Sequence, residues 1–154
     1  MNLTRRSALG ALGFFAGSVA MPAFAQTVGS ITVSDPWVRA LRHGTLGVTA
    51  YFQLSNRGLA DDRLIEVYSG PYGRAKFGEM HTRGIVPIVR DVESVAVPAG
   101  ADVTLRPGQL FVVLTPQAYV LRPGSTVPLT LTFERSGKVD VLARVTNQAL
   151  GNLR

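Results

Sequence analysis

The stretch VPLTLTFERSGKVDVLARV, residues 127–145, decides the fold class, because apolar and polar side chains alternate in two successive runs. A period of two is typical of a β-strand with one buried face. Ser136-Gly137 between the runs supplies turn residues, so the stretch predicts a β-hairpin. The side chains expected to point inward are Val127, Leu129, Leu131, Phe133, Val139, Val141, Ala143 and Val145.

The same kind of signal continues on the N-terminal side of this hairpin. Residues 46–54 alternate equally well, and Asn56-Arg57-Gly58 then turns the chain. Shorter strands are expected at residues 30–34, 62–68, 75–81, 85–90, 102–105 and 110–114. Asp35-Pro36 is expected to end the first of these, and Thr82-Arg83-Gly84 is expected to turn a hairpin whose second arm contains Pro87. A proline inside a strand indicates a sheet edge or a bulge.

The composition fits one all-β domain. About nine short strands with turn signals every ~8–12 residues predict a β-sandwich or a small barrel, and no stretch after the leader has the pattern of a long amphipathic helix. The chain has 154 residues, enough for one domain and not for two of ordinary size. It has no cysteine, which excludes disulfides, thiolate metal sites and cysteine nucleophiles.

The first 25 residues, MNLTRRSALGALGFFAGSVAMPAFA, have the pattern of an export signal. A charged start precedes an apolar run, and Ala23-Phe24-Ala25 fits the small-residue cleavage pattern. We therefore expect cleavage after Ala25, one domain in residues 26–154, and a periplasmic protein that does not span the membrane. Arg5-Arg6 resembles a twin-arginine signal, although general secretory export remains an alternative. An uncleaved membrane anchor is the other alternative for this segment.

Several phrases, in order along the chain, resemble the PCu(A)C family of periplasmic copper chaperones. They are ITVSDPWVRA, GVTAYFQLSNRG, ADDRLIEV, GEM, VPAGADVTLRPGQ and VPLTLTFERSGKVDV, and the likeness extends over about residues 31–145. The resemblance implies a cupredoxin-like Greek-key β-sandwich. It also implies the handling of Cu(I) for the copper centres of respiratory oxidases, with a copper-centre assembly protein or another periplasmic protein as partner.

The ligand pattern of that family, H-x10-M-x21-H-x-M, can be placed on this sequence without a gap. It falls on Gly78, Val89, Phe111 and Val113, none of which has a side chain able to bind a metal. Cu(I) prefers thioether sulfur and imidazole nitrogen, so the family site is replaced. Phe111 and Val113 share one strand face, so with Val89 they predict an apolar patch suited to a protein partner. The alternative is that these side chains extend the core.

Residues 26–154, which would remain after cleavage of the leader, contain few other side chains that could bind Cu(I). Met80, His81 and His43 are its methionine and histidines, and they form a hypothetical relocated Cu(I) site. Met80 and His81 are adjacent, so on an extended strand their side chains point to opposite faces. A lone loop histidine such as His43 is more often a surface residue than a ligand.

Two function classes follow from these observations. In the first, the protein is copper-chaperone-like and binds Cu(I) weakly, through a relocated site, or not at all. In the second, it is a non-metal binding or scaffold protein that uses the apolar end of the sandwich. The sequence offers no combination of acid, base and nucleophile that would predict an enzyme. Asp61-Asp62 is expected to lie in a solvated turn. The scattered arginines do not form the basic cluster typical of a nucleic-acid surface.

Overall fold

The described residues of a computed structural model, 25–39, 48–115 and 121–146, are all β with no helix. No helix in this part of the chain is long and apolar enough to cross a membrane. The strands are β1 (Gln26–Val28), β2 (Ile31–Arg39), β3 (Val48–Asn56), β4 (Asp62–Ser69), β5 (Gly73–Arg74), β6 (Lys76–Arg83), β7 (Val86–Val92), β8 (Val95–Val97), β9 (Asp102–Thr104), β10 (Leu110–Leu114), β11 (Thr126–Phe133) and β12 (Gly137–Thr146). The leader expected in residues 1–25 lies outside the described residues except for Ala25.

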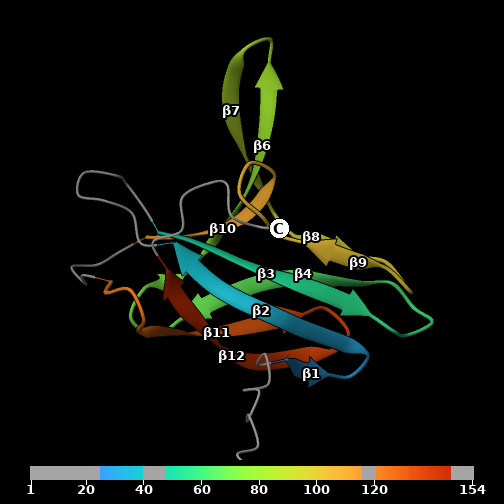
Figure 1. The fold of residues 1–154 in the computed structure, drawn as a ribbon. Coiled ribbons are helices and arrows are strands. Elements are labelled where there is room, and N and C mark those ends of the chain that lie inside the picture. The colour runs from blue at the N-terminus through green and yellow to red at the C-terminus, as the bar shows by residue number, and fades with distance from the viewer. Residues whose placement is uncertain (1–24, 40–47, 116–120, 147–154) are drawn as a thin grey trace, which may run out of the picture.

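The strands form one sheet in the order β5-β4-β11-β12-β2-β3-β10-β6-β7, with β1, β8 and β9 paired beside this path. The sheet curls so that its two halves pack against each other as in a β-sandwich (Figure 1). β12 and β2 pair in parallel, whereas the other ladders of the described residues are antiparallel. The prediction of an all-β sandwich is confirmed.

The hairpin predicted from residues 127–145 is also confirmed. β11 pairs with β12 from Thr126↔Arg144 to Phe133↔Gly137 without a register shift. All eight side chains expected to point inward are buried. Burying an aliphatic or aromatic side chain of this size contributes roughly 1.5–3 kcal/mol, so this hairpin is a main part of the core.

The expected break at Asp35-Pro36 is wrong, because β2 continues through it. The ladder between β2 and β3 shifts register between Ser34 and Trp37, and Asp35 has a φ of 48°. Asp is one of the few residues that adopts this left-handed conformation at low cost, so a bulge absorbs the irregularity. The sheet has twelve strands rather than about nine, since short pairings such as β1 and β5 carry too few residues to show a period.

β6 and β7 form a hairpin that projects from the sandwich (Figure 1). Its turn consists of Gly84 and Ile85, since β6 extends to Arg83 and pairs it with Val86. The turn expected at Thr82-Arg83-Gly84 is therefore placed too early. Gly84 has a φ of 67°, which a type II′ turn requires at its first central residue. β7 is the last strand of the sheet order, so the edge position expected for Pro87 is confirmed.

Candidate functional site

The four positions that the sequence pattern matches to copper ligands lie on one face of the sheet, where β10, β6 and β7 run side by side. β10 pairs with β6 at Phe111↔Gly78, and β6 pairs with β7 at Met80↔Val89. Side chains directly opposite each other, or two residues apart on one strand, share a face. The register thus places Gly78, Val89, Phe111 and Val113 on the same face, together with Met80.

The aromatic ring of Phe111 fills the space above Gly78. A Cβ atom added at Gly78 would lie 2.7 Å from Cε2 of Phe111 and 2.9 Å from its Cζ, which is closer than real Cβ atoms approach. Phe111 is only 7 % exposed. The ring at residue 111 therefore requires that residue 78 have no side chain, and the residue types at these two positions depend on each other.

The remaining two positions are more open. Val89 is 53 % exposed, and Val113 is partly buried. Phe111 is buried, yet it is not a member of the main core cluster. The structure thus places the three side chains of the expected apolar patch in three environments: Phe111 is covered, Val113 is intermediate, and Val89 faces solvent on the projecting hairpin.

The structure does not bring Met80 and His81 to a common face. The β6–β7 register is continuous, so adjacent residues on β6 alternate between faces. His81 shares its face with Glu79, and its Nε2 lies 2.8 Å from Oε2 of that carboxylate. Met80 lies on the other face, partly buried, and its N–H donates to the carbonyl of Gln109. His43 lies outside the described residues.

The comparisons with known proteins can now be set beside this geometry. Residues 31–145 match the family model "lipoprotein LpqE-like". The chain belongs to the LpqE-like family. No curated protein matches it.

Among solved structures, the LpqE-like chain is similar to the copper-bound PCuAC domain from PmoF2, with 27 % identity and a TM-score of 0.69 over 81 % of this chain and 99 % of that one. The apo PCuAC domain from PmoF1 gives 27 % identity and a TM-score of 0.67, covering 81 % of this chain and all of that one. Cu(I)-bound DR1885 from Deinococcus radiodurans, at 21 % identity and a TM-score of 0.60, covers 82 % of this chain and 83 % of its own. At this identity, the similarity to DR1885 is evidence for a shared fold and for nothing more. The predicted resemblance to PCu(A)C copper chaperones is confirmed.

The residues at the four positions matched to the family's ligands do not fit Cu(I). Glycine, valine and phenylalanine carry no thioether or imidazole group, and the Phe111 ring fills the space above Gly78. Within the described ranges, no group of three His, Cys, Asp or Glu side chains could hold a metal ion. The LpqE-like chain is therefore similar in fold to a copper-bound PCuAC domain, whereas the side chains at these four positions are apolar.

One polar residue at the edge of the core has a role that the sequence analysis missed. Asp62 was expected in a solvated turn, but it is only 6 % exposed. Its carboxylate accepts hydrogen bonds from the amides of Arg63, Arg135 and Ser136 at 2.7–3.0 Å. Burial raises the pKa of Asp62, but the hydrogen bonds, first that of the Ser136 side chain, outweigh burial and lower its pKa below the usual value. Through these hydrogen bonds, the Asp62 carboxylate connects the start of β4 to the turn between β11 and β12.

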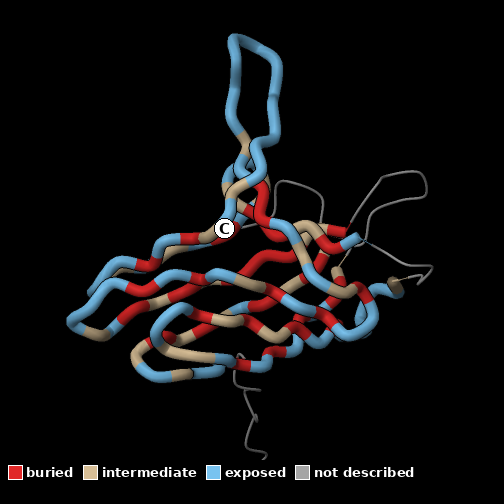
Figure 2. Tube along the Cα trace, turned by 180° about the vertical axis from the view of Figure 1, so that it is seen from behind, coloured by how far each residue is buried: buried red, intermediate tan, exposed pale blue. Residues whose placement is uncertain are grey.

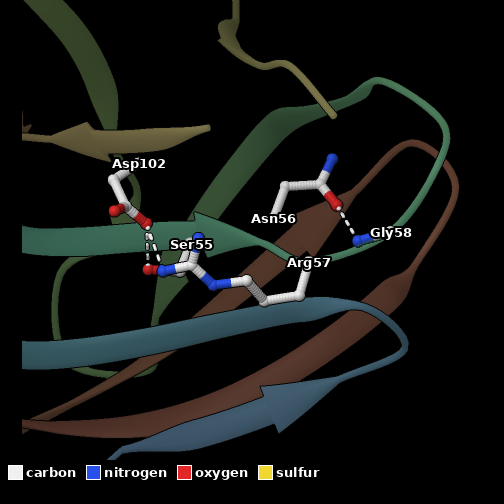
Figure 3. A network of polar contacts seen from close by, with 5 residues as sticks. All are labelled: Ser55, Asn56, Arg57, Gly58 and Asp102. Carbon is white, nitrogen blue, oxygen red and sulfur yellow. Dashed lines mark hydrogen bonds and ion pairs between the residues drawn. The ribbon is translucent and has the colours of Figure 1, made fainter. Parts of the chain in front are cut away.

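Asn56, at the end of β3, holds the following loop in place. Its side chain is completely buried and donates to the carbonyls of Ala60 and Val97. Its Oδ1 accepts the amide of Gly58, a contact drawn in Figure 3. The Asn-x-Gly sequence was the available signal, because an asparagine in a turn often accepts an amide two residues later.

Beside this loop, Figure 3 also shows a surface network around Asp102. The carboxylate of Asp102 accepts a hydrogen bond from the Ser55 hydroxyl at 2.6 Å and forms an ion pair with Arg57 at 3.0 Å. The Ser55 hydrogen bond and, to a smaller extent, the Arg57 guanidinium lower the pKa of Asp102. Arg57 and Asp102 are both well exposed, so this network orders a surface turn and adds little stability.

Proposed function

We propose that this protein is an exported, copper-chaperone-like binding protein that does not carry Cu(I) at the position used by its copper-binding relatives. The observation that carries the proposal is the packing of Phe111 on Gly78, which fills the space above the first ligand position. The copper-bound state named for the PmoF2 domain supports the chaperone-like class. The family description as a lipoprotein is in line with export to the periplasm.

A binding role fits this site better than a catalytic one. The face that carries the four replaced positions offers Val89 and Met80 as an exposed and a partly buried apolar side chain, without a convergent acid and base. Apolar side chains on a projecting element are typical of a contact surface. In this proposal the protein acts in the same compartment as copper-handling proteins. It acts through its apolar contact surface instead of through a bound metal.

The second candidate function is weak Cu(I) binding through Met80, His81 and His43. The observation in its favour is that Met80 lies directly opposite Val89, a former ligand position, on the same sheet face. A competition titration with a Cu(I) chelator separates the two functions. We expect no stoichiometric Cu(I) retention, and the same result for Met80→Leu with His81→Ala. Retention by the wild type that is lost in this double variant would establish the relocated site and overturn the proposal.

Restoring the ligands tests the register itself. The combined variant Gly78→His, Val89→Met, Phe111→His and Val113→Met puts the family's side chains on one face of the sheet. We expect it to bind one Cu(I), since removal of the Phe111 ring frees the space that an imidazole at residue 78 needs. A control that keeps Phe111 and carries only Gly78→His and Val89→Met should not bind. A folded quadruple variant without Cu(I) affinity would contradict the assignment of these four positions.

A further inference from the structure

The far end of the β6–β7 hairpin carries the largest concentration of exposed apolar side chains in the described part of the chain. We name residues 80–89 the hairpin tip. Of the eight large hydrophobic residues that are exposed among the described ones, four lie here: Ile85 at 99 %, Val86 at 59 %, Val89 at 53 % and Ile88 at 42 % exposure. Figure 2 shows both arms of the hairpin as exposed almost throughout, away from the buried sandwich.

These side chains surround the tip rather than forming one flat face. Val89 lies on the face of Met80, whereas Val86 and Ile88 lie on the opposite face with His81, and Ile85 occupies the turn. A flat docking surface would leave one of these faces in water. An apolar group on every side instead suits insertion into a medium that surrounds the hairpin tip.

The charges of the hairpin tip are of one sign. Residues 80–89 contain Arg83 and no aspartate or glutamate, and Arg90 follows directly. Neither arginine forms an ion pair with another described residue. The acids of the hairpin lie at its base: Glu79 is next to His81 and opposite Arg90 in the register, and Asp91 is 3.9 Å from Lys76. The charge of the hairpin tip itself is therefore positive and complements an anionic surface. So does the formal net charge of residues 26–154, which is +4 once Arg5 and Arg6 of the leader are subtracted from the +6 of the whole chain.

The outer edge of β7 is less suited to pairing with another strand. Arg83↔Val86 closes the two-residue turn, so Thr82↔Pro87 is a pair whose backbone groups point away from the partner strand. Pro87 has no N–H to offer at this outward position, and a proline or a charged side chain on an edge strand opposes strand addition. The same missing N–H removes one backbone group that would be unsatisfied near lipid.

We infer that the hairpin tip inserts shallowly into an anionic phospholipid bilayer surface, with the side chains of Ile85 and Val86 at the headgroup end of the acyl chains and Arg83 at the phosphates. Arg90 lies four residue pairs farther from the turn, on the water side of the interface. Membrane attachment of this kind grows with the apolar area buried and with attraction to anionic lipids. The turn backbone at Gly84 and Ile85 keeps its contact with water in the headgroup region, which limits the depth. The inference is independent of whether the protein binds copper.

The test is sedimentation of the protein with lipid vesicles. The chain should begin at Gln26, because the apolar leader would itself bind lipid; the PCuAC domain from PmoF2, solved as a separate domain, corresponds to 81 % of this chain. We expect binding to vesicles of phosphatidylcholine with phosphatidylglycerol and much weaker binding to phosphatidylcholine alone. Ile85→Ser with Val86→Ser should weaken binding by about tenfold or more. Arg83→Gln should weaken it about fivefold, and only on the anionic vesicles.

The matched control is Leu59→Ser, which removes an equally exposed aliphatic side chain (104 %) outside the hairpin and should leave vesicle binding unchanged. Both tip residues are exposed, so the variants are expected to fold, and circular dichroism checks this. Absence of binding by the wild type, or equal binding by the tip variant, overturns the inference. So does a dimer of the wild type that the tip variant loses, because the occupant would then be a second copy of the chain.

Discussion

The β11–β12 hairpin and the β6–β7 hairpin are built alike and differ in what covers them. Both are antiparallel pairs with unbroken register and several β-branched residues. In β12 every second residue is buried, whereas no residue of β7 is. β11 and β12 lie in the middle of the sheet order, while β7 ends it. The sequence of a strand thus determines which side chains lie on each of its two faces. The elements that pack against the strand determine whether either face is buried.

The hydrophobic side chains of the two hairpins therefore have different uses. In β11–β12 they exclude water from the core and stabilise the fold. In the outer part of β6–β7, at residues 85–89, they remain largely in water at a cost, and this cost is offset when the hairpin contacts another apolar surface. Gly78 marks the boundary, since it lies under the Phe111 ring where the hairpin leaves the sandwich.

The largest difference between the hairpins is expected from truncating one aliphatic side chain in each. Leu131→Ala removes a completely buried side chain and should lower the free energy of unfolding by about 2–5 kcal/mol. Ile88→Ala, on a residue that is 42 % exposed, should change it by less than about 0.5 kcal/mol. Urea denaturation measures both. Similar losses in the two variants would mean that the β6–β7 hairpin is covered in the folded protein.

A smaller effect is expected at the boundary. Gly78→Ala forces a Cβ against the ring of Phe111 and should cost about 1–3 kcal/mol. The cost should fall when Phe111→Ala is made as well, so a double-mutant cycle should show coupling. Gly70→Ala is the control, since a Cβ there would meet nothing within 4 Å. Equal costs at the two glycines would contradict the close packing of the ring on Gly78.

The smallest effect concerns how pH acts on the turn of β11–β12. The pKa of Asp62 is lowered in the folded protein, so its carboxylate stabilises the fold above the ordinary aspartate value of 3.8. This contribution should be lost as the pH falls through the lower folded-state pKa. Asp62→Asn should therefore be less stable than the wild type near neutral pH and closer to it at about pH 3. Urea midpoints at both pH values measure this, and a constant difference would exclude the role of the carboxylate.

Much of the fold could be predicted from the sequence because its strands depend on local patterns. The alternation in residues 127–145 predicted a hairpin, and the phrases distributed over residues 31–145 predicted the copper-chaperone-like fold. The turn of the β6–β7 hairpin was placed too early, because Gly84 alone offers the positive φ that the first turn position needs. The role of Asp62 was missed, because its hydrogen-bond donors Arg135 and Ser136 lie more than 70 residues away in the chain.

The sequence by itself determined the longer strands, the family resemblance and the residue types at the positions matched to the family's ligands. Each of these depends on side chains close together in the chain or on the identity of single residues. Only the tertiary structure decided that Phe111 packs on Gly78, that Met80 and His81 face apart, and that the outer part of the β6–β7 hairpin stands outside the core. The physical reason is that burial and contact depend on which distant strands become neighbours, and alternation along one strand carries no information about them.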